Sequence, residues 1–343
     1  MPKICILGSG SWGTAQALLL SSKEFQVILW GRIEDGVDSL QQDRENRRFL
    51  PGIRLSDTIV ATSDLARALK GADIVVMAVP SQSLREVLEK ARPYLGKDSC
   101  LVNTAKGLEI SSGMRMSQVV EDVLGKQSRE RYAVLSGPSH AEEVARNIPT
   151  AITVASYHKE NAFLVQDLYM TPFFRVYTNP DVAGVELGGA LKNIIALGTG
   201  IASGLGYGDN TQAALLTRGL HEIIRMGEAM GGEARTFSGL SGIGDLVVTC
   251  SSRHSRNRQA GVLIGQGYSL EETLMQIGMV VEGAHTIRVV HRLATQLKID
   301  MPICTACYNV LYANRKARDE VDDLMRRQKK HEIEEIVKRK KGW

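Results

Sequence analysis

The 343-residue sequence has no long apolar run and no cysteine framework. No stretch approaches the ~20 consecutive apolar residues that a membrane-spanning helix needs. The first residues lead directly into an expected strand, which leaves no room for a signal peptide. The five cysteines are an odd number in a chain this large, so a set of structural disulfides is not expected. These absences indicate a reducing compartment, and we expect the cytoplasm.

Patterns typical of metal and nucleic-acid binding are missing as well. Cys304 and Cys307 form a single CxxC without a second pair, and there is neither an HExxH nor an acidic cluster with ligand spacing. We expect no metal site and interpret both cysteines as reduced thiols that pack in the interior. The net charge of +4 is small and spread along the chain, which argues against nucleic acid as the main partner but allows a small anionic ligand.

What the chain does contain is a different pattern in each half. Its length suits two domains. The first half alternates short β-branched runs with helix-like segments such as 13–22, 64–69 and 83–92, which is typical of a parallel sheet buried on both faces. Beyond Asn179-Pro180, apolar residues recur at helical spacing instead. The expected strands are 4–7, 27–30, 59–61, 74–79, 101–103, 134–135, 152–154 and 175–177.

A glycine-rich turn, Gly8, Gly10 and Gly13 in KICILGSGSWGT, follows the first expected strand. In a dinucleotide-binding turn the first glycine permits the sharp bend, the second lets the diphosphate approach the backbone, and the third lets helix and strand pack closely. The diphosphate then lies at the positive end of the helix. The placement predicts a Rossmann-like α/β domain over residues 1–185 that binds a dinucleotide, followed by an all-α domain over 186–343. The alternative is a purely structural turn.

The second expected strand ends in Arg32, where a site specific for NAD usually carries a carboxylate. A guanidinium can hold a 2′-phosphate with two parallel hydrogen bonds. We therefore favour NADP, with NAD as the second cofactor. Alternatively, Arg32 faces solvent or stacks on the adenine.

Two lysines are candidates for the chemistry that accompanies hydride transfer. Lys192 lies in a small, apolar helical stretch, GGALKNII, where it is either desolvated and functional or extended to the surface. Lys106 follows the carboxyl end of an expected strand, where open α/β sheets bind their ligands, although an ordinary loop lysine would look the same.

Two further stretches suit an anionic substrate. Asp245 follows a glycine-rich turn and could fix the position of a lysine. The stretch SSRHSRNR over 251–258 combines guanidinium groups and hydroxyls ahead of a helix expected to start near Gln259, which is how proteins hold phosphate. A solvated basic loop is the alternative.

Five stretches in order resemble one family. They are GSGSWGTA, NTAKGLE, GPSHAEEVA, VELGGALKNIIALGTGIASGLGYGDNT and GLSGIGDLVVTCSSRHSRNR. From about residue 3 to about residue 325, the chain looks like the bacterial NAD(P)-dependent glycerol-3-phosphate dehydrogenase. The resemblance implies an oxidoreductase that reversibly reduces dihydroxyacetone phosphate to sn-glycerol 3-phosphate, the backbone precursor of phospholipids. Members of the family often form dimers, so the resemblance also implies a homodimer.

The same resemblance implies roles for single residues. Lys192 would be the catalytic acid and base, with Asn193 beside it and Asp245 orienting its ammonium, and Lys106 would touch both substrate and cofactor. His140 stands where some relatives carry phenylalanine. The other implied substrate-binding residues are Gly137, Ser139, Ser255, Arg256 and Asn257. The implied cofactor-binding residues, besides Lys106 and the three glycines, are Ser11, Trp12, Arg32, Ala141, Arg256, Val280 and Glu282.

Three other hypotheses remain open. A related dehydrogenase with the same two-domain plan could act on a β-hydroxy acid or a sugar-acid phosphate. A regulatory protein could sense the cofactor without turnover, but it would need neither Lys192 nor the arginine-rich loop. The basic stretches 326–330 and 338–341, which we expect on a terminal helix, could touch anionic lipids. A solvated charged helix is the more common case, so membrane association is not our expectation.

Overall fold

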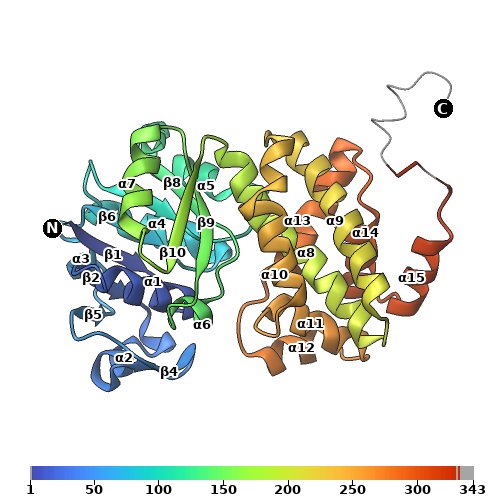
Figure 1. Cartoon of the computed structure of the whole chain (residues 1–343), viewed down its shortest axis with the longest axis horizontal. Coiled ribbons are helices and arrows are strands. Elements are labelled where there is room, and N and C mark those ends of the chain that lie inside the picture. Colours follow the sequence, from blue (N-terminus) through green and yellow to red (C-terminus); the bar gives the residue numbers. More distant parts are fainter. Residues whose placement is uncertain (1, 330, 333–343) are drawn as a thin grey trace.

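The computed structural model describes residues 2–329 and 331–332, and places a sheet domain beside a helical domain (Figure 1). Within these residues, no helix is both long and apolar enough to cross a membrane.

Eight strands form the main sheet in the order β10-β9-β8-β7-β6-β1-β2-β5. Neighbouring strands run parallel except β8 and β9, which are antiparallel. The predicted, mostly parallel sheet is thereby confirmed, and each predicted strand overlaps an observed one. The strands are β1 (Lys3–Leu7), β2 (Gln26–Trp30), β5 (Ile59–Thr62), β6 (Ile74–Met77), β7 (Cys100–Asn103), β8 (Tyr132–Ser136), β9 (Thr150–Ser156) and β10 (Phe174–Asn179).

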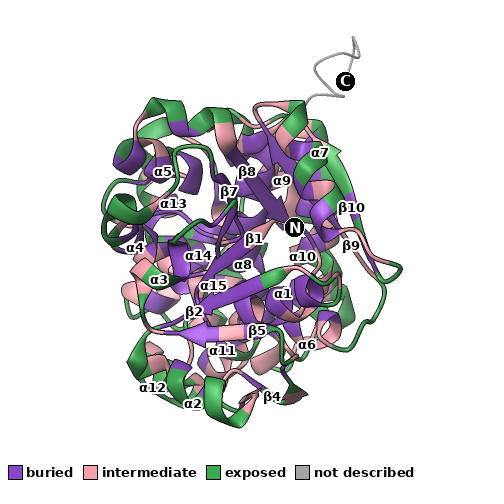
Figure 2. Cartoon of the chain, turned by 90° about the vertical axis from the view of Figure 1, so that its left-hand side faces the viewer, coloured by how far each residue is buried: buried purple, intermediate pink, exposed green. Residues whose placement is uncertain are grey.

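Helices cover both faces of this sheet, as its uninterrupted apolar strands require. Alternate residues of β1 enter two different cores: Ile4 and Ile6 face one, and Cys5 and Leu7 the other. The central strands β1, β6, β7 and β8 are accordingly buried almost throughout, whereas the edge strand β10 is partly exposed (Figure 2). Helices α1 (Ser11–Ser21), α6 (Ala141–Val144) and α7 (Lys159–Tyr169) contribute to the first core, and α3 (Leu65–Leu69), α4 (Leu84–Ala91) and α5 (Met116–Leu124) to the second.

A short helix and a small hairpin between β2 and β5 were not predicted. Helix α2 (Val37–Asp43) leads into β3 (Glu45–Asn46), which pairs antiparallel with β4 (Leu50–Arg54). Strand β4 has the sequence LPGIR, and proline and glycine both weaken a strand pattern. The hairpin brings Arg48 and Phe49 to the cavity described below.

The helical domain is built around α8 (Val182–Gly204), which is buried along most of its length. It crosses α11 (Arg256–Gly265) at glycines: a Cβ on Gly200 would lie 2.9 Å from the Cα of Gly261 and 2.2 Å from the backbone oxygen of Arg258. This close crossing brings the arginine-rich loop to the helix that carries Lys192. The surrounding helices are α9 (Asp209–Ala229), α10 (Asp245–Ser251), α11 (Arg256–Gly265), α12 (Leu270–Ile277), α13 (Glu282–Leu297), α14 (Pro302–Tyr312) and α15 (Ala317–Met325).

The start of α8 connects the two domains. Val182 and Val185 pack in the core of the sheet, whereas the apolar residues from Leu187 onward belong to the core of the helical domain. One helix thus runs through the boundary predicted between residues 185 and 186, and that boundary stays a prediction.

Two expected helix limits were wrong. The helix after the arginine-rich loop begins at Arg256 rather than near Gln259, because the Ser255 hydroxyl caps it by accepting the N–H of Arg258. The last described helix ends at Met325. Residues 326–329 were expected to be helical, but they are not. The second basic stretch, 338–341, lies outside the described residues. Cys304 and Cys307 are buried and unpaired.

Candidate active site

A cavity of about 700 Å³ lies between the two domains. Its wall includes the segments that follow β1, β2, β6 and β7, which is the edge where open parallel sheets bind ligands. Most of the predicted site residues line it: Gly8, Gly10, Ser11, Trp12, Arg32, Lys106, Ser139, Ala141, Lys192, Asn193, Ser255, Arg256, Asn257, Val280 and Glu282. Gly13, Gly137 and Asp245 are not among the residues that line it.

The glycine turn fits the diphosphate of a dinucleotide. Gly8 has a φ of +119°, and a Cβ there would lie 2.8 Å from the backbone of Ala78. A Cβ on Gly13 would lie 1.9 Å from the oxygen of Gly8, so this residue permits the close contact of α1 with the turn. A Cβ on Gly10, which precedes α1, would meet nothing within 4 Å. Space is therefore open in front of the first turn of α1, where an anion is favoured.

Arg32 lines the cavity just after the end of β2, and its guanidinium is already paired. Its Nε and Nη2 donate to the two carboxylate oxygens of Asp35, over 2.8 and 3.2 Å. The Arg32 side chain is 60% exposed, so a ligand can reach it. A second guanidinium, that of Arg48, donates to the backbone oxygen of Glu34 over 2.8 Å. Both Arg32 and Arg48 line the cavity.

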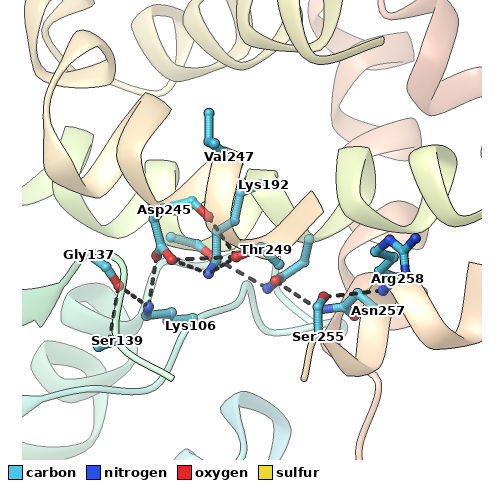
Figure 3. A network of polar contacts seen from close by, with 12 residues as sticks. Lys106, Gly137, Ser139, Lys192, Asp245, Val247, Thr249, Ser255, Asn257 and Arg258 are labelled. Atoms are coloured by element: carbon cyan, nitrogen blue, oxygen red, sulfur yellow. Dashed lines mark hydrogen bonds and ion pairs between the residues drawn. The ribbon is translucent and has the colours of Figure 1, made fainter. Parts of the chain in front are cut away.

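Lys106 and Lys192 share one buried carboxylate (Figure 3). The Nζ atom of Lys192 donates to Oδ1 of Asp245 over 2.5 Å, and that of Lys106 donates to Oδ2 over 2.7 Å. Lys106 also donates to the backbone oxygen of Gly137 over 2.9 Å. The Lys192 side chain is 7% exposed and that of Lys106 is 20% exposed. The lysines therefore present two cations at one wall of the cavity.

Burial and the contacts between the lysines and the shared carboxylate set the pKa values of Lys192 and Asp245. Burial lowers the pKa of Lys192 to about 8, and the nearby Asp245 carboxylate limits the decrease. Burial alone would raise the pKa of Asp245, but the ammonium groups of Lys106 and Lys192 together hold it below its usual value. The Asp245 carboxylate therefore stays ionised between the two lysines at neutral pH.

Thr249 belongs to this cluster, and our sequence analysis missed it. Its hydroxyl donates to the backbone oxygen of Asp245 over 2.6 Å, which leaves the oxygen free to accept from Nζ of Lys192 over 2.7 Å. Thr249 lies four residues after Asp245 on α10, hence on the same helix face. That spacing was the signal in the sequence.

The two predicted asparagines form a chain of hydrogen bonds. The N–H of Gly283 donates to Oδ1 of Asn257 over 2.8 Å, so the amide nitrogen of Asn257 is the atom that faces Asn193. That nitrogen donates to Oδ1 of Asn193 over 2.9 Å. The orientation of Asn193, next to Lys192, is therefore set from the start of α13.

The first turn of α11 offers a site for an anion. Ser255 caps this ten-residue helix, and Arg256 is its first residue. Burial lowers the pKa of Arg256, and the carboxylates of Glu282 and Glu142 oppose that effect. A guanidinium and a helix N-terminus on the same wall of the cavity are suited to a phosphate.

The segment after β8 closes the cavity on another side. Gly137 has a φ of +148°, and a Cβ there would lie 2.9 Å from the Cα of Ile152. The Ser139 hydroxyl donates to the backbone oxygen of Gly137 over 3.1 Å. His140 lines the cavity, and burial together with the Lys192 cation lowers its pKa. Among the described residues, its Nε2 atom has no hydrogen-bond partner.

Glu282 ties the helical domain to the sheet domain at the cavity. Its Oε1 accepts the N–H of Ser81 over 2.9 Å, and its Oε2 accepts the hydroxyl of Ser81 over 2.5 Å. Ser81 follows β6 and Glu282 begins α13. Both carboxylate oxygens of Glu282 therefore already have partners in the sheet domain.

Comparison with known proteins identifies the family. The sequence models described as NAD-dependent glycerol-3-phosphate dehydrogenase N-terminus and C-terminus match residues 3–162 and 181–322. The chain is 98% identical to the glycerol-3-phosphate dehydrogenase [NAD(P)+] of Syntrophomonas wolfei over the full length of both chains. It is 54% identical to that of Carboxydothermus hydrogenoformans, over 96% of this chain and 98% of that protein.

A solved structure agrees with this comparison. The crystal structure of glycerol-3-phosphate dehydrogenase from Coxiella burnetii matches with a TM-score of 0.91 and 38% identity, over 95% of this chain and 99% of that one. The fold and cavity thus define an NAD(P)-dependent oxidoreductase with a Rossmann-type domain and a helical domain. Within that class, the chain belongs to the glycerol-3-phosphate dehydrogenase family. The predicted family, fold class, enzyme class and NAD(P) dependence are confirmed.

Proposed function

We propose that the chain reversibly reduces dihydroxyacetone phosphate to sn-glycerol 3-phosphate with NADPH or NADH. The observation that carries the proposal is the pair of lysines on one buried carboxylate, in a cavity that also contains the glycine cradle and the first turn of α11. A ketone needs a proton donor at its oxygen, and a phosphate needs fixed cations and N–H groups. Groups of both kinds line the same cavity.

In this proposal Lys192 is the catalytic acid and base. When bound, the nicotinamide supplies or accepts the hydride. Two N–H groups of the Lys192 ammonium point to Asp245 and Thr249, so the third remains for the substrate oxygen. It stabilises the charge that develops on the carbonyl oxygen and donates the proton. In the oxidation, neutral Lys192 keeps its two hydrogen bonds and directs its lone pair to the alcohol proton.

The lowered pKa of Lys192 suits both directions of the reaction. Reduction needs the ammonium form, and oxidation needs the neutral amine. With a pKa of about 8, both forms are populated near neutral pH. Lys106 adds a second positive charge beside the reacting oxygen and contacts both ligands.

The substrate is assigned to Ser255, Arg256 and Asn257 at the start of α11, where its phosphate would lie, and to Gly137 and Ser139 on the segment after β8. Binding energy from the phosphate, which is remote from the reacting carbon, orients the carbonyl. Substrates without phosphate should therefore lose turnover as well as affinity.

The cofactor is assigned to the glycine cradle and to Ser11, Trp12, Lys106, Ala141, Val280 and Glu282, with Arg256 shared between the two ligands. We favour NADPH over NADH, because Arg32 lines the cavity just after β2 ends. Its pairing with Asp35 means that a 2′-phosphate competes with a carboxylate for the same guanidinium. The preference for NADPH is therefore expected to be moderate.

The biological setting follows from the reaction. Glycerol 3-phosphate is the glycerol backbone of phospholipids, so we assign the chain to phospholipid synthesis in the cytoplasm. We further propose a homodimer that acts without nucleic acid or membrane association, with domains divided near residue 185.

The direct test follows the absorbance of NADPH and NADH with either dihydroxyacetone phosphate or unphosphorylated dihydroxyacetone. Rapid oxidation that depends on the phosphate supports the substrate and the roles of its binding wall. The ratio of the NADPH and NADH rates measures the contribution of Arg32, with Arg32→Ser as the comparison. Cofactor binding without oxidation of either cofactor would contradict the proposal and favour a cofactor sensor.

A further inference from the structure

Outside the cavity, one buried carboxylate connects the segments that carry the two lysines. Glu186 lies near the start of α8, with its side chain 3% exposed. Its Oε1 accepts the hydroxyl of Tyr132 over 2.6 Å and the backbone N–H of Ser117 over 2.7 Å. Its Oε2 accepts the Ser117 hydroxyl over 2.7 Å and Nη1 of Arg115 over 2.6 Å. Every one of these partners belongs to the sheet domain.

This carboxylate fixes the helix that carries Lys192. Glu186 and Lys192 are six residues apart on α8, a distance of about 9 Å along a helix axis. Tyr132 lies on β8, in the interior of the sheet. The bond to Tyr132 therefore sets the position of α8 relative to the edge of the sheet where the cofactor is assigned.

The same carboxylate also fixes the segment that carries Lys106. The residues from 104 to 115 connect β7 to α5, and Ser117 donates from the first turn of α5, where backbone N–H groups have no partner within the helix. Arg115 forms an antiparallel bridge with Leu108, and the N–H of Glu109 donates to the oxygen of Met114 over 3.0 Å. Arg115 is thus coupled through the backbone to the immediate neighbourhood of Lys106.

We propose that Glu186 is a positioning residue that sets the spacing of Lys106 and Lys192 around Asp245. This inference rests on the roles proposed above for the two lysines. A carboxylate that is paired and fully hydrogen-bonded in the interior holds its partners in one geometry, and it is costly to disrupt. Neither lysine touches Glu186, so its effect on the reaction is transmitted through α8 and the segment 104–115.

The test is a double-mutant cycle between Glu186→Gln and Lys106→Ala. A misplacement of about 1 Å can cost up to ~100-fold in rate, and we expect Glu186→Gln to lower kcat about ten-fold. In the Lys106→Ala background the same change should lower kcat less than about two-fold further, because one of the two groups that it positions is gone. The KM for the cofactor should stay within about two-fold, since the glycine cradle is separate.

Glu222→Gln is the matched control. Glu222 is a buried carboxylate on α9 that accepts the N–H groups of Ile303 and Cys304, in the first turn of α14. It therefore performs a similar capping role away from the lysines. Both variants should lower the melting temperature, but only Glu186→Gln should lower kcat.

The outcomes separate the inference from the proposed function. The positioning role is overturned if Glu186→Gln lowers kcat by the same factor in the wild type and in Lys106→Ala. It is also overturned if the kcat of Glu186→Gln equals that of Glu222→Gln. A normal kcat for Lys106→Ala alone would instead contradict the role of Lys106 in the proposed function. If Glu186→Gln does not fold, Tyr132→Phe removes one of the four hydrogen-bond donors. It should lower kcat about two- to three-fold with the same dependence on Lys106.

Discussion

Asp245 and Glu222 are two carboxylates of the helical domain with the same exposure, 1% of each residue. Two ammonium groups hold the pKa of Asp245 below its usual value, although its burial acts in the opposite direction. Among the residues that the structure describes, Glu222 accepts hydrogen bonds only from two backbone N–H groups, and burial raises its pKa to about 7. Depth alone therefore does not decide the charge of a carboxylate: the charge of its hydrogen-bond partners does.

The difference also separates a functional site from a structural one. Asp245 stays ionised and holds two cations at the cavity, where they can act on a substrate. Glu222 ties α14 to α9 and faces no reacting group. Changes at Asp245 and its partners should alter the reaction, whereas a change at Glu222 should alter stability and its dependence on pH.

The largest effect is expected for Lys192→Ala, which removes the proposed proton donor. Loss of a positioned acid and of its charge should lower kcat about 1,000-fold. Cofactor binding should persist, because the glycine cradle belongs to the other domain; titration with NADPH fluorescence measures it. Lys159→Ala, on the outer helix α7, is the control and should retain full activity. Near-normal turnover of Lys192→Ala would remove Lys192 from the catalytic role.

Asp245→Asn should have the next largest effect, because it removes the negative charge that the two lysines share. The side chain at position 245 would then be neutral, like a protonated Glu222. Two ammonium groups would then face an amide, and kcat for reduction at pH 7 should fall about 100-fold. Without the carboxylate, burial lowers the pKa of Lys192 below about 8. Reduction needs the protonated lysine, so its loss with rising pH should begin at a lower pH than in the wild type. A pH profile of kcat checks this, and an unchanged alkaline limb would contradict the role of Asp245.

Thr249→Val should have a smaller effect, since Lys192 keeps its bond to Asp245. The valine removes the acceptor of one N–H group, and we expect kcat to fall about ten-fold, with little change in the KM of the cofactor. Thr249→Ser restores the hydroxyl and serves as the matched control, with kcat within about two-fold of the wild type. Equal rates for the valine and serine variants would show that the hydroxyl does not orient Lys192.

Glu222→Gln should have the smallest effect on the reaction and a distinct effect on stability. Because its pKa rises from 4.5 to about 7 on folding, the folded protein binds a proton here that the unfolded chain has released. The free energy of unfolding therefore decreases as pH rises from 4.5 to 7, by about 3 kcal/mol for this group at most. Glutamine removes this dependence. Melting temperatures of the wild type and of Glu222→Gln, measured from pH 4.5 to 7, test this prediction. If the melting temperatures of the two proteins change with pH in parallel, the raised pKa of Glu222 is contradicted.

Much of the sheet domain could be predicted because its signals are local. The eight expected strands are β-branched or apolar runs, and each overlaps an observed strand. The β3–β4 hairpin was missed because Pro51 and Gly52 interrupt its pattern. The predicted terminal helix was too long. Charged side chains alone do not keep residues 326–329 helical once the apolar contacts of α15 end.

The amino-acid sequence by itself determined the alternation of strands and helices, the glycine turn and the identities of the residues around the cavity. These features depend on neighbours a few positions apart. Only the tertiary structure decided that Lys106 meets Asp245 across 139 positions, and that Thr249 and Glu186 lie where they can hold the lysines in place. The physical reason is that burial and long-range partners set the position and charge of each group, and both exist only once the two domains pack together.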